Sequence, residues 1–117
     1  MNDVAEYWNS KKRLPKCRYM TDSRMRKLAA RLKEPLFADN WKLIIDKMEA
    51  SDFVTGNIIA NASYYVTNKD VRSWKATIDW LLANDTNYVK VLEGKYDNKY
   101  HKVFHYIFSF IISSPVD

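Results

Sequence analysis

The residues best suited to chemistry in this chain are basic, and they are concentrated near the N-terminus. Residues 11–33 contain ten lysines and arginines against one acid, Asp22, a net charge of +9, whereas the whole chain carries only +5. Such a concentrated field attracts polyanions, of which nucleic acid is the commonest in cells. We therefore predict phosphate contacts, with a merely solvated face as the alternative. The predicted contact residues are Lys11, Lys12, Arg13, Lys16, Arg18, Arg24, Lys27 and Arg31.

A second candidate group contains aromatic residues, on which the bases of single strands stack. Trp41 and Trp74 have helical spacing with other apolar residues, so we expect them in the core, each costing roughly 3–5 kcal/mol when replaced by alanine. The rotation of about 100° per helical residue places Trp80 on another face, where we expect it to be exposed or interfacial. Lys90, Lys95 and Tyr96 are candidate partner or base contacts, although a capped helix end explains them equally well.

The residue patterns that usually indicate catalysis or cofactor binding do not occur in the sequence. Two glycines cannot build a glycine-rich phosphate loop, and no nucleophile motif is present. His101 and His105 have the i, i+4 spacing of metal ligands, but a third ligand would have to come from elsewhere. Cys17 excludes an internal disulfide and is most simply a plain thiol. We expect a binding protein that is not an enzyme and holds no metal or cofactor.

Helical periodicity and capping signals predict several helices, and the scarcity of glycine and proline argues against a sandwich or barrel. Residues 51–56 are predicted to be a loop. The first three predicted helices span residues 3–8, a segment that ends at about residue 34 and has Thr21 or Asp22 as its N-cap, and a segment from residues 38–40 to 50. A further helix is capped by Ser73, includes Trp74 and is interrupted at Asn84–Asp85. The last spans residues 86–93 and is followed by Gly94 in the left-handed conformation. Residues 57–67 fit either a small hairpin or an irregular insertion.

The C-terminal residues 101–117 form an apolar tail that fits either a buried helix or a strand. Its run Val103–Ile112 is too short to cross a bilayer, yet in water it would promote aggregation. We expect it to be buried against the domain's own helices or across a symmetric interface. Deletion of residues 101–117 is therefore predicted to give an insoluble or molten chain.

Together these patterns predict one all-α or mainly α domain over residues 1–117, a small bundle of about four to five helices. The length suits a single domain, and 47% hydrophobic residues suffice for one core. Residues 1–9 are polar and acidic rather than a signal peptide, so we expect a cytoplasmic protein without membrane contact.

Three groups of short motifs also carry a family likeness. They are Glu6–Asn9 with Leu14–Pro15, Thr21–Asp22 and Ala30–Glu34; Trp41 with Ala50–Gly56; and Ser73–Leu82 with Asn87–Tyr96. In this order they resemble the C-terminal domain of phage and prophage replication proteins, which are replisome organisers usually carrying a winged-helix region before this domain. The likeness covers about residues 4–97, although the segment between Gly56 and Trp74 is longer than usual and the tail more apolar.

The resemblance implies a DNA replication accessory domain that binds DNA and a host or phage replication protein, such as a helicase or its loader. With the basic segment, it predicts weak, sequence-independent and salt-dependent DNA binding that charge reversal at Arg24, Lys27 and Arg31 should reduce. The alternative is a small phage-encoded inhibitor that blocks a host nucleic-acid machine, such as a defence nuclease. Oligomeric state and strand preference are left open by the sequence.

Overall fold

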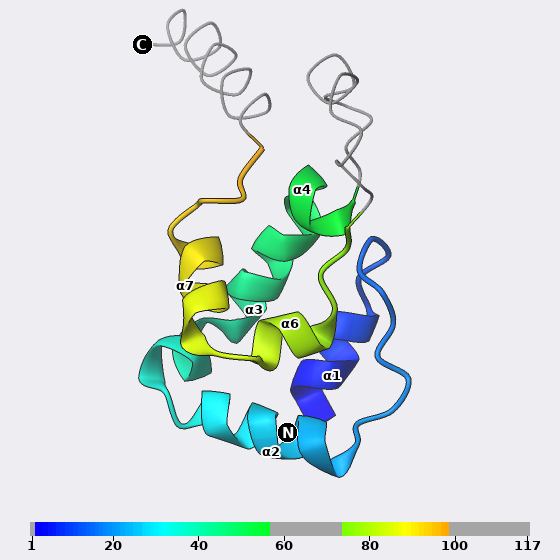
Figure 1. Cartoon of the computed structure of the whole chain (residues 1–117), viewed down its shortest axis with the longest axis vertical. Coiled ribbons are helices and arrows are strands. Elements are labelled where there is room, and N and C mark those ends of the chain that lie inside the picture. The colour runs from blue at the N-terminus through cyan, green and yellow to red at the C-terminus, as the bar shows by residue number, and fades with distance from the viewer. Residues whose placement is uncertain (1, 57–73, 99–117) are drawn as a thin grey trace, which may run out of the picture.

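The computed structural model describes residues 2–56 and 74–98, and all regular structure within these ranges is helical (Figure 1), which confirms the predicted all-α class. The helices are α1 (Asn2–Asn9), α2 (Asp22–Leu32), α3 (Pro35–Ala50), α4 (Asp52–Thr55), α6 (Ile78–Leu82) and α7 (Asp85–Leu92). None of the helices described is long and apolar enough for a bilayer span. The predictions for residues 57–67, Ser73, His101, His105 and the tail lie outside the described residues.

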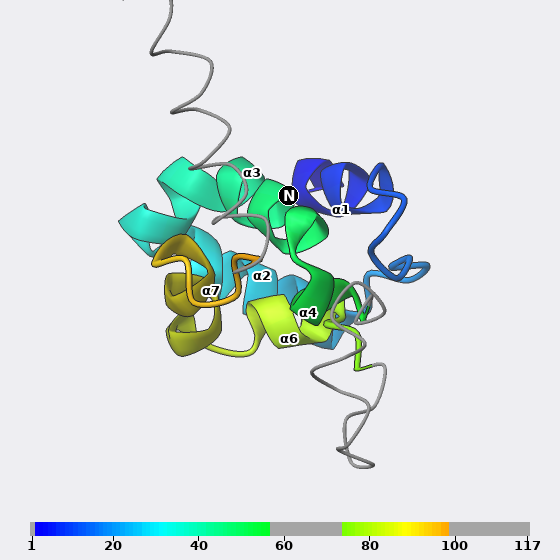
Figure 2. The same ribbon diagram turned by 90° about the horizontal axis from the view of Figure 1, so that it is seen from above.

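Helix α3 is the central element of the bundle. It packs against α1, α2, α4 and α7, while α6 contacts both α2 and α7. Seen from above, α1 and α3 lie on one side of the bundle and α2 and α6 on the other (Figure 2). In this arrangement the basic helix α2 packs one face against the core, and its opposite face points away from the other described helices.

The core contains large side chains from every part of the described chain. Trp8, Phe37 and Tyr88 are the largest of those that are fully buried. The rings of Phe37 and Tyr88 meet edge to face at 5.2 Å between centroids, which joins α3 to α7. The indole nitrogen of Trp8 donates a hydrogen bond of 2.6 Å to the carbonyl of Pro15, so the loop after α1 is held against that helix.

Several helix ends follow the local signals of the sequence. Thr21 is the N-cap of α2, as predicted, because its hydroxyl accepts a hydrogen bond from the Arg24 backbone N–H. Asn84 caps α7 through the backbone N–H of Asn87. Gly94 follows α7 with a φ of 84°, the left-handed conformation predicted for that position.

Two predicted boundaries between residues 35 and 56 are wrong. Helix α3 begins at Pro35 rather than at residues 38–40. Proline is favourable at the first position of a helix, because the backbone N–H that it lacks would have no hydrogen-bond partner within the helix. The predicted loop of residues 51–56 contains the short helix α4. Ser51 caps it by accepting a hydrogen bond from the Val54 N–H at 3.1 Å, and Gly56 ends it with a φ of 75°.

The predicted helix that includes Trp74 is also wrong in its extent. Residues 74–77 are not helical, and the N–H of Ala76 donates to the Val54 carbonyl at 2.9 Å. Helix α6 begins only at Ile78, after the N-cap Thr77. The helical-wheel argument for Trp74 and Trp80 therefore does not apply, and the predicted core position of Trp74 is wrong. Trp74 is 41% exposed, whereas Trp80 is partly buried against the core.

Candidate nucleic-acid interface

The basic segment of residues 11–33 forms the loop after α1, the helix α2 and its C-cap. Five of the eight predicted phosphate contacts are engaged inside the molecule. Lys11 pairs with Asp46 at 2.7 Å, Arg13 with Asp52 at 2.8 Å, Arg24 with Asp79 at 2.8 Å and Arg31 with Glu34 at 3.3 Å, and the Lys16 ammonium donates to the Asn9 carbonyl. Three of the ten basic residues of this segment are therefore paired with acids of α3, α4 and α6, and Arg31 with Glu34 directly after α2.

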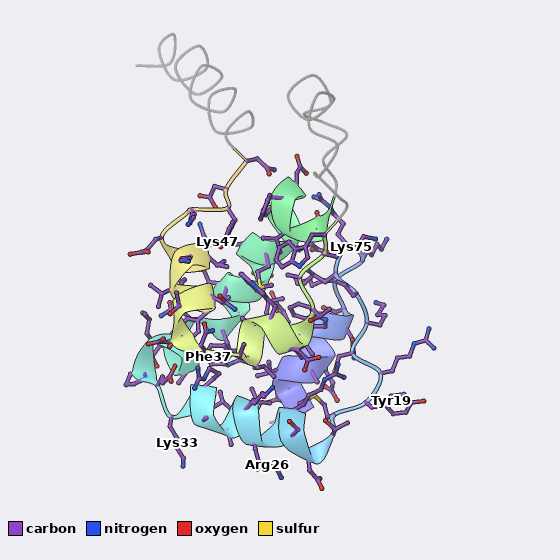
Figure 3. All side chains as sticks on the ribbon, in the orientation of Figure 1. Tyr19, Arg26, Lys33, Phe37, Lys47 and Lys75 are labelled. Atoms are coloured by element: carbon purple, nitrogen blue, oxygen red, sulfur yellow. The ribbon has the colours of Figure 1, made fainter. Side chains whose placement is uncertain are left out.

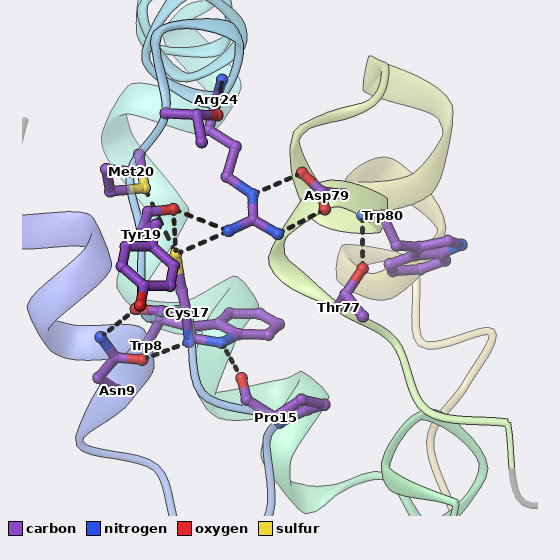
Figure 4. A network of polar contacts seen from close by, with 11 residues as sticks. Trp8, Asn9, Pro15, Cys17, Tyr19, Met20, Arg24, Thr77, Asp79 and Trp80 are labelled. Atoms are coloured by element: carbon purple, nitrogen blue, oxygen red, sulfur yellow. Dashed lines mark hydrogen bonds and ion pairs between the residues drawn. The ribbon is translucent and has the colours of Figure 1, made fainter.

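Arg24 has the most extensive of these internal contacts (Figure 4). Its guanidinium donates two hydrogen bonds, of 2.9 and 2.8 Å, to the two carboxylate oxygens of Asp79. The remaining terminal nitrogen donates to the Tyr19 carbonyl at 2.8 Å and contacts the buried sulfur of Cys17 at 3.7 Å. Such a two-pronged geometry is specific to arginine, and here it ties α2 to α6 and to the preceding loop.

The pKa values of this pair reflect the same contacts. The hydrogen bonds from Arg24 lower the pKa of Asp79, and the nearby charge of Lys27 lowers it further. The hydrogen bond to Asp79 in turn raises the pKa of Arg24. Each of the three guanidinium nitrogens of Arg24 therefore has a partner within the fold.

The loop between α1 and α2 is fastened in a similar way. Arg13 donates to the hydroxyl of Thr55 as well as to Asp52, both at 2.8 Å, and so joins this loop to α4. Lys11 lies 4.3 Å above the Tyr7 ring, and its hydrogen bond to Asp46 raises the pKa of its ammonium group. Charge reversal at these positions would break internal contacts as well as change the surface.

Three predicted contact residues have neither an ion pair nor a side-chain hydrogen bond among the described residues: Lys12, Arg18 and Lys27, all of them exposed. Lys12 borders an open hollow that it shares with Asp46 and Glu49, so its charge is partly offset. Lys27 lies on α2, close enough to Asp79 for its charge to lower the pKa of that carboxyl group, so its charge is partly offset as well.

Arg26 and Lys33 belong with Lys27, although the predicted contact set omitted them. Both are exposed and have no ion pair within residues 2–56 and 74–98, and their side chains project from α2 away from the bundle (Figure 3). The small exposed residues Ser23 and Ala30 lie on the same side of the helix. We define the α2 outer face as Asp22, Ser23, Arg26, Lys27, Ala30 and Lys33, where the exposed Asp22 lies one helical turn before Arg26. Their positions opposite the buried Leu28 were available from the helical periodicity.

Tyr19 and Arg18 are exposed in the loop just before α2. Tyr19 is the most exposed large apolar side chain described, at 74%, and it projects outward from the loop (Figure 3). Arg18 beside it is exposed as well. An exposed ring next to a cation provides the pair of contacts, stacking and charge, that single-stranded nucleic acid accepts.

The candidate partner or base contacts Trp80, Lys90, Lys95 and Tyr96 are brought together only in part. The ring centroids of Trp80 and Tyr96 lie 5.8 Å apart in an edge-to-face contact. The backbone N–H of Lys95 donates to the Lys90 carbonyl at 3.0 Å, as part of the turn after α7. Phe53 and Trp74, which the predicted site omitted, complete this aromatic cluster, so it contains more apolar surface than charge.

Comparison with known proteins adds no family to this picture. A scan against protein-family models found no match, and searches of the curated proteins and of the solved structures found none either. The resemblance to phage replication proteins therefore stays a prediction from the motifs.

Proposed function

We propose that this domain binds nucleic acid through the phosphate backbone, with the α2 outer face as the principal contact. The observation that carries the proposal is that Arg26, Lys27 and Lys33 stay exposed on one helix after the internal ion pairs are accounted for. Arg26 and Lys33 are seven residues apart, or about 10 Å along the helix axis. Each strand of duplex DNA carries a phosphate about every 3.4 Å of the duplex axis, so about three phosphates of one strand face such a length.

The small side chains on this face support the same proposal. Ser23 and Ala30 would let a sugar–phosphate backbone approach the helix closely, with the longer cations reaching it from either side. No base-reading pattern is required, so the binding is expected to be weak, independent of sequence and strongly dependent on salt. In the setting that the motifs resemble, such a contact would position an accessory domain on DNA during phage replication.

The test compares two charge-matched variants. Arg26→Gln/Lys33→Gln removes two cations from the α2 outer face, and Lys42→Gln/Lys75→Gln removes two exposed cations elsewhere. Fluorescence anisotropy with labelled single- and double-stranded DNA, from about 50 to 200 mM salt, measures affinity and its salt dependence. The first variant should lower the slope of log K against log salt by about 2, since each phosphate contact contributes about 0.9. The control should change it far less.

Two results would overturn the proposal. One is a wild-type chain that binds neither form of DNA at about 50 mM salt, which would favour the inhibitor hypothesis instead. The other is an equal loss in both variants, which would show that only the overall charge matters. Circular dichroism of both variants establishes that each remains folded.

A further inference from the structure

Four aromatic side chains form a continuous cluster at the end of the bundle where α4 lies. Phe53 and Trp74 are 47% and 41% exposed, with ring centroids 5.7 Å apart. Tyr96 stacks on Phe53 at 5.5 Å with an interplanar angle of 3°, and Trp80 meets Trp74 edge to face at 5.6 Å. We define the aromatic patch as Phe53, Trp74, Trp80 and Tyr96. Single exposed apolar residues are ordinary, whereas contiguous ones mark a surface that another apolar group covers.

The described chain ends beside this patch. The hydroxyl of Ser51 donates to the Tyr96 carbonyl at 2.6 Å. The side chain of Asn98 then accepts a hydrogen bond from the Asp52 N–H at 2.7 Å and donates one to the Ala50 carbonyl at 2.9 Å. Asn98 is thereby fixed to the residue that precedes Phe53, so the rest of the chain starts within a short distance of the patch.

The sequence after Asn98 has the composition of a partner for an aromatic surface. Its run Val103–Ile112 has no charged residue and contains seven valine, isoleucine and phenylalanine residues as well as Tyr106. Four residues separate Asn98 from Val103, so Val103 lies at most about 18 Å from Asn98 along a fully extended chain. A tether this short holds the run near the patch at an effective concentration of the order of millimolar.

We propose that residues 103–112 dock on the aromatic patch of their own chain. The proposal explains two apolar features with one contact: a patch without cover among the described residues, and an uncharged run that would aggregate in water. Other exposed apolar side chains, such as Leu36 and Leu43, lie on α3 and belong to no aromatic cluster. The inference is independent of nucleic-acid binding, because the patch and the α2 outer face share no residue.

Limited proteolysis of the full chain with chymotrypsin tests this contact, because the run contains several aromatic cleavage sites. Phe53→Ser/Trp74→Ser removes the exposed half of the patch, and Leu36→Ser/Leu43→Ser removes two equally exposed apolar side chains elsewhere. Cleavage within residues 103–112, located by mass spectrometry, should be slow in the wild type and in the control. It should become about tenfold faster in the patch variant, since proteolysis follows the undocked fraction.

A reciprocal change in the run itself keeps the test decisive if the patch variant fails to fold. Phe108→Ser/Phe110→Ser leaves every described core residue in place, and it should increase acrylamide quenching of tryptophan fluorescence because Trp74 loses its cover. Unchanged quenching, or equal cleavage rates in wild type and patch variant, would overturn the proposal. So would a wild-type dimer that the patch variant converts to monomer, since the patch would then bind a second copy.

Discussion

Replacing Trp8 by alanine is expected to destabilise the domain by about 3–5 kcal/mol, the range for large aromatic deletions in cores. Trp8 has no exposed surface, and it packs in the core where α1 meets α3. A tryptophan buries up to about 250 Å², which at about 25 cal/mol per Å² gives roughly 6 kcal/mol as an upper estimate. The two figures agree well enough to place this residue among the largest single contributions in the molecule.

Trp8→Phe separates packing from hydrogen bonding. Phenylalanine retains an aromatic ring but leaves the Pro15 carbonyl without the indole donor, which lies 2.6 Å away in the structure. Losing the partner of a partly buried carbonyl costs about 1–3 kcal/mol. We therefore expect Trp8→Phe to be intermediate between the wild type and Trp8→Ala.

Urea unfolding followed by circular dichroism measures these differences, with Trp74→Ala as the matched control. Because Trp74 is 41% exposed, its replacement should cost roughly 1–2 kcal/mol, less than the core range. A Trp74→Ala variant as unstable as Trp8→Ala would show that Trp74 contributes as much to the fold as a core residue, which is the sequence-based expectation, and not as a half-exposed one.

Three further predictions concern single groups. The hydrogen bond from Arg24 lowers the pKa of Asp79, so this ion pair stabilises the fold above about pH 4 and loses that effect as the pH falls. In urea unfolding, Asp79→Asn should be less stable than the wild type at pH 7, and the difference in the free energy of unfolding should shrink towards pH 2. Burial raises the pKa of Tyr88 to about 12, so ultraviolet titration should show one tyrosine that ionises late and that is missing from Tyr88→Phe. For the same reason the free energy of unfolding should fall as the pH rises from about 10 to 12. Gly94→Ala should lower the free energy of unfolding by about 1–2 kcal/mol, because Gly94 has a φ of 84° and a Cβ there would lie 2.9 Å from a carboxylate oxygen of Asp97. An unchanged melting temperature of this variant would contradict the prediction.

Local signals in the sequence were sufficient for several elements of the fold. The cap at Thr21, the break at Asn84 and the left-handed Gly94 were all predicted, because each depends on one residue and its immediate backbone. The start of α6 was missed, although it too has a local signal in its N-cap Thr77, because Ser73 offers a cap of the same kind. The non-helical stretch before Thr77 is held by the hydrogen bond between Ala76 and Val54, which are far apart in the sequence.

The excess of positive charge near the N-terminus was determined by the sequence alone, since formal charge depends only on composition. Which of those charges face solvent was decided by the tertiary structure. Arg24 meets Asp79 and Arg13 meets Asp52 only because α6 and α4 fold against the N-terminal segment. Arg26 and Lys33 have no such partner among the described residues, because they lie on the side of α2 that points away from the bundle. An ion pair needs two groups within about 4 Å, and for residues distant in the chain only folding sets that distance.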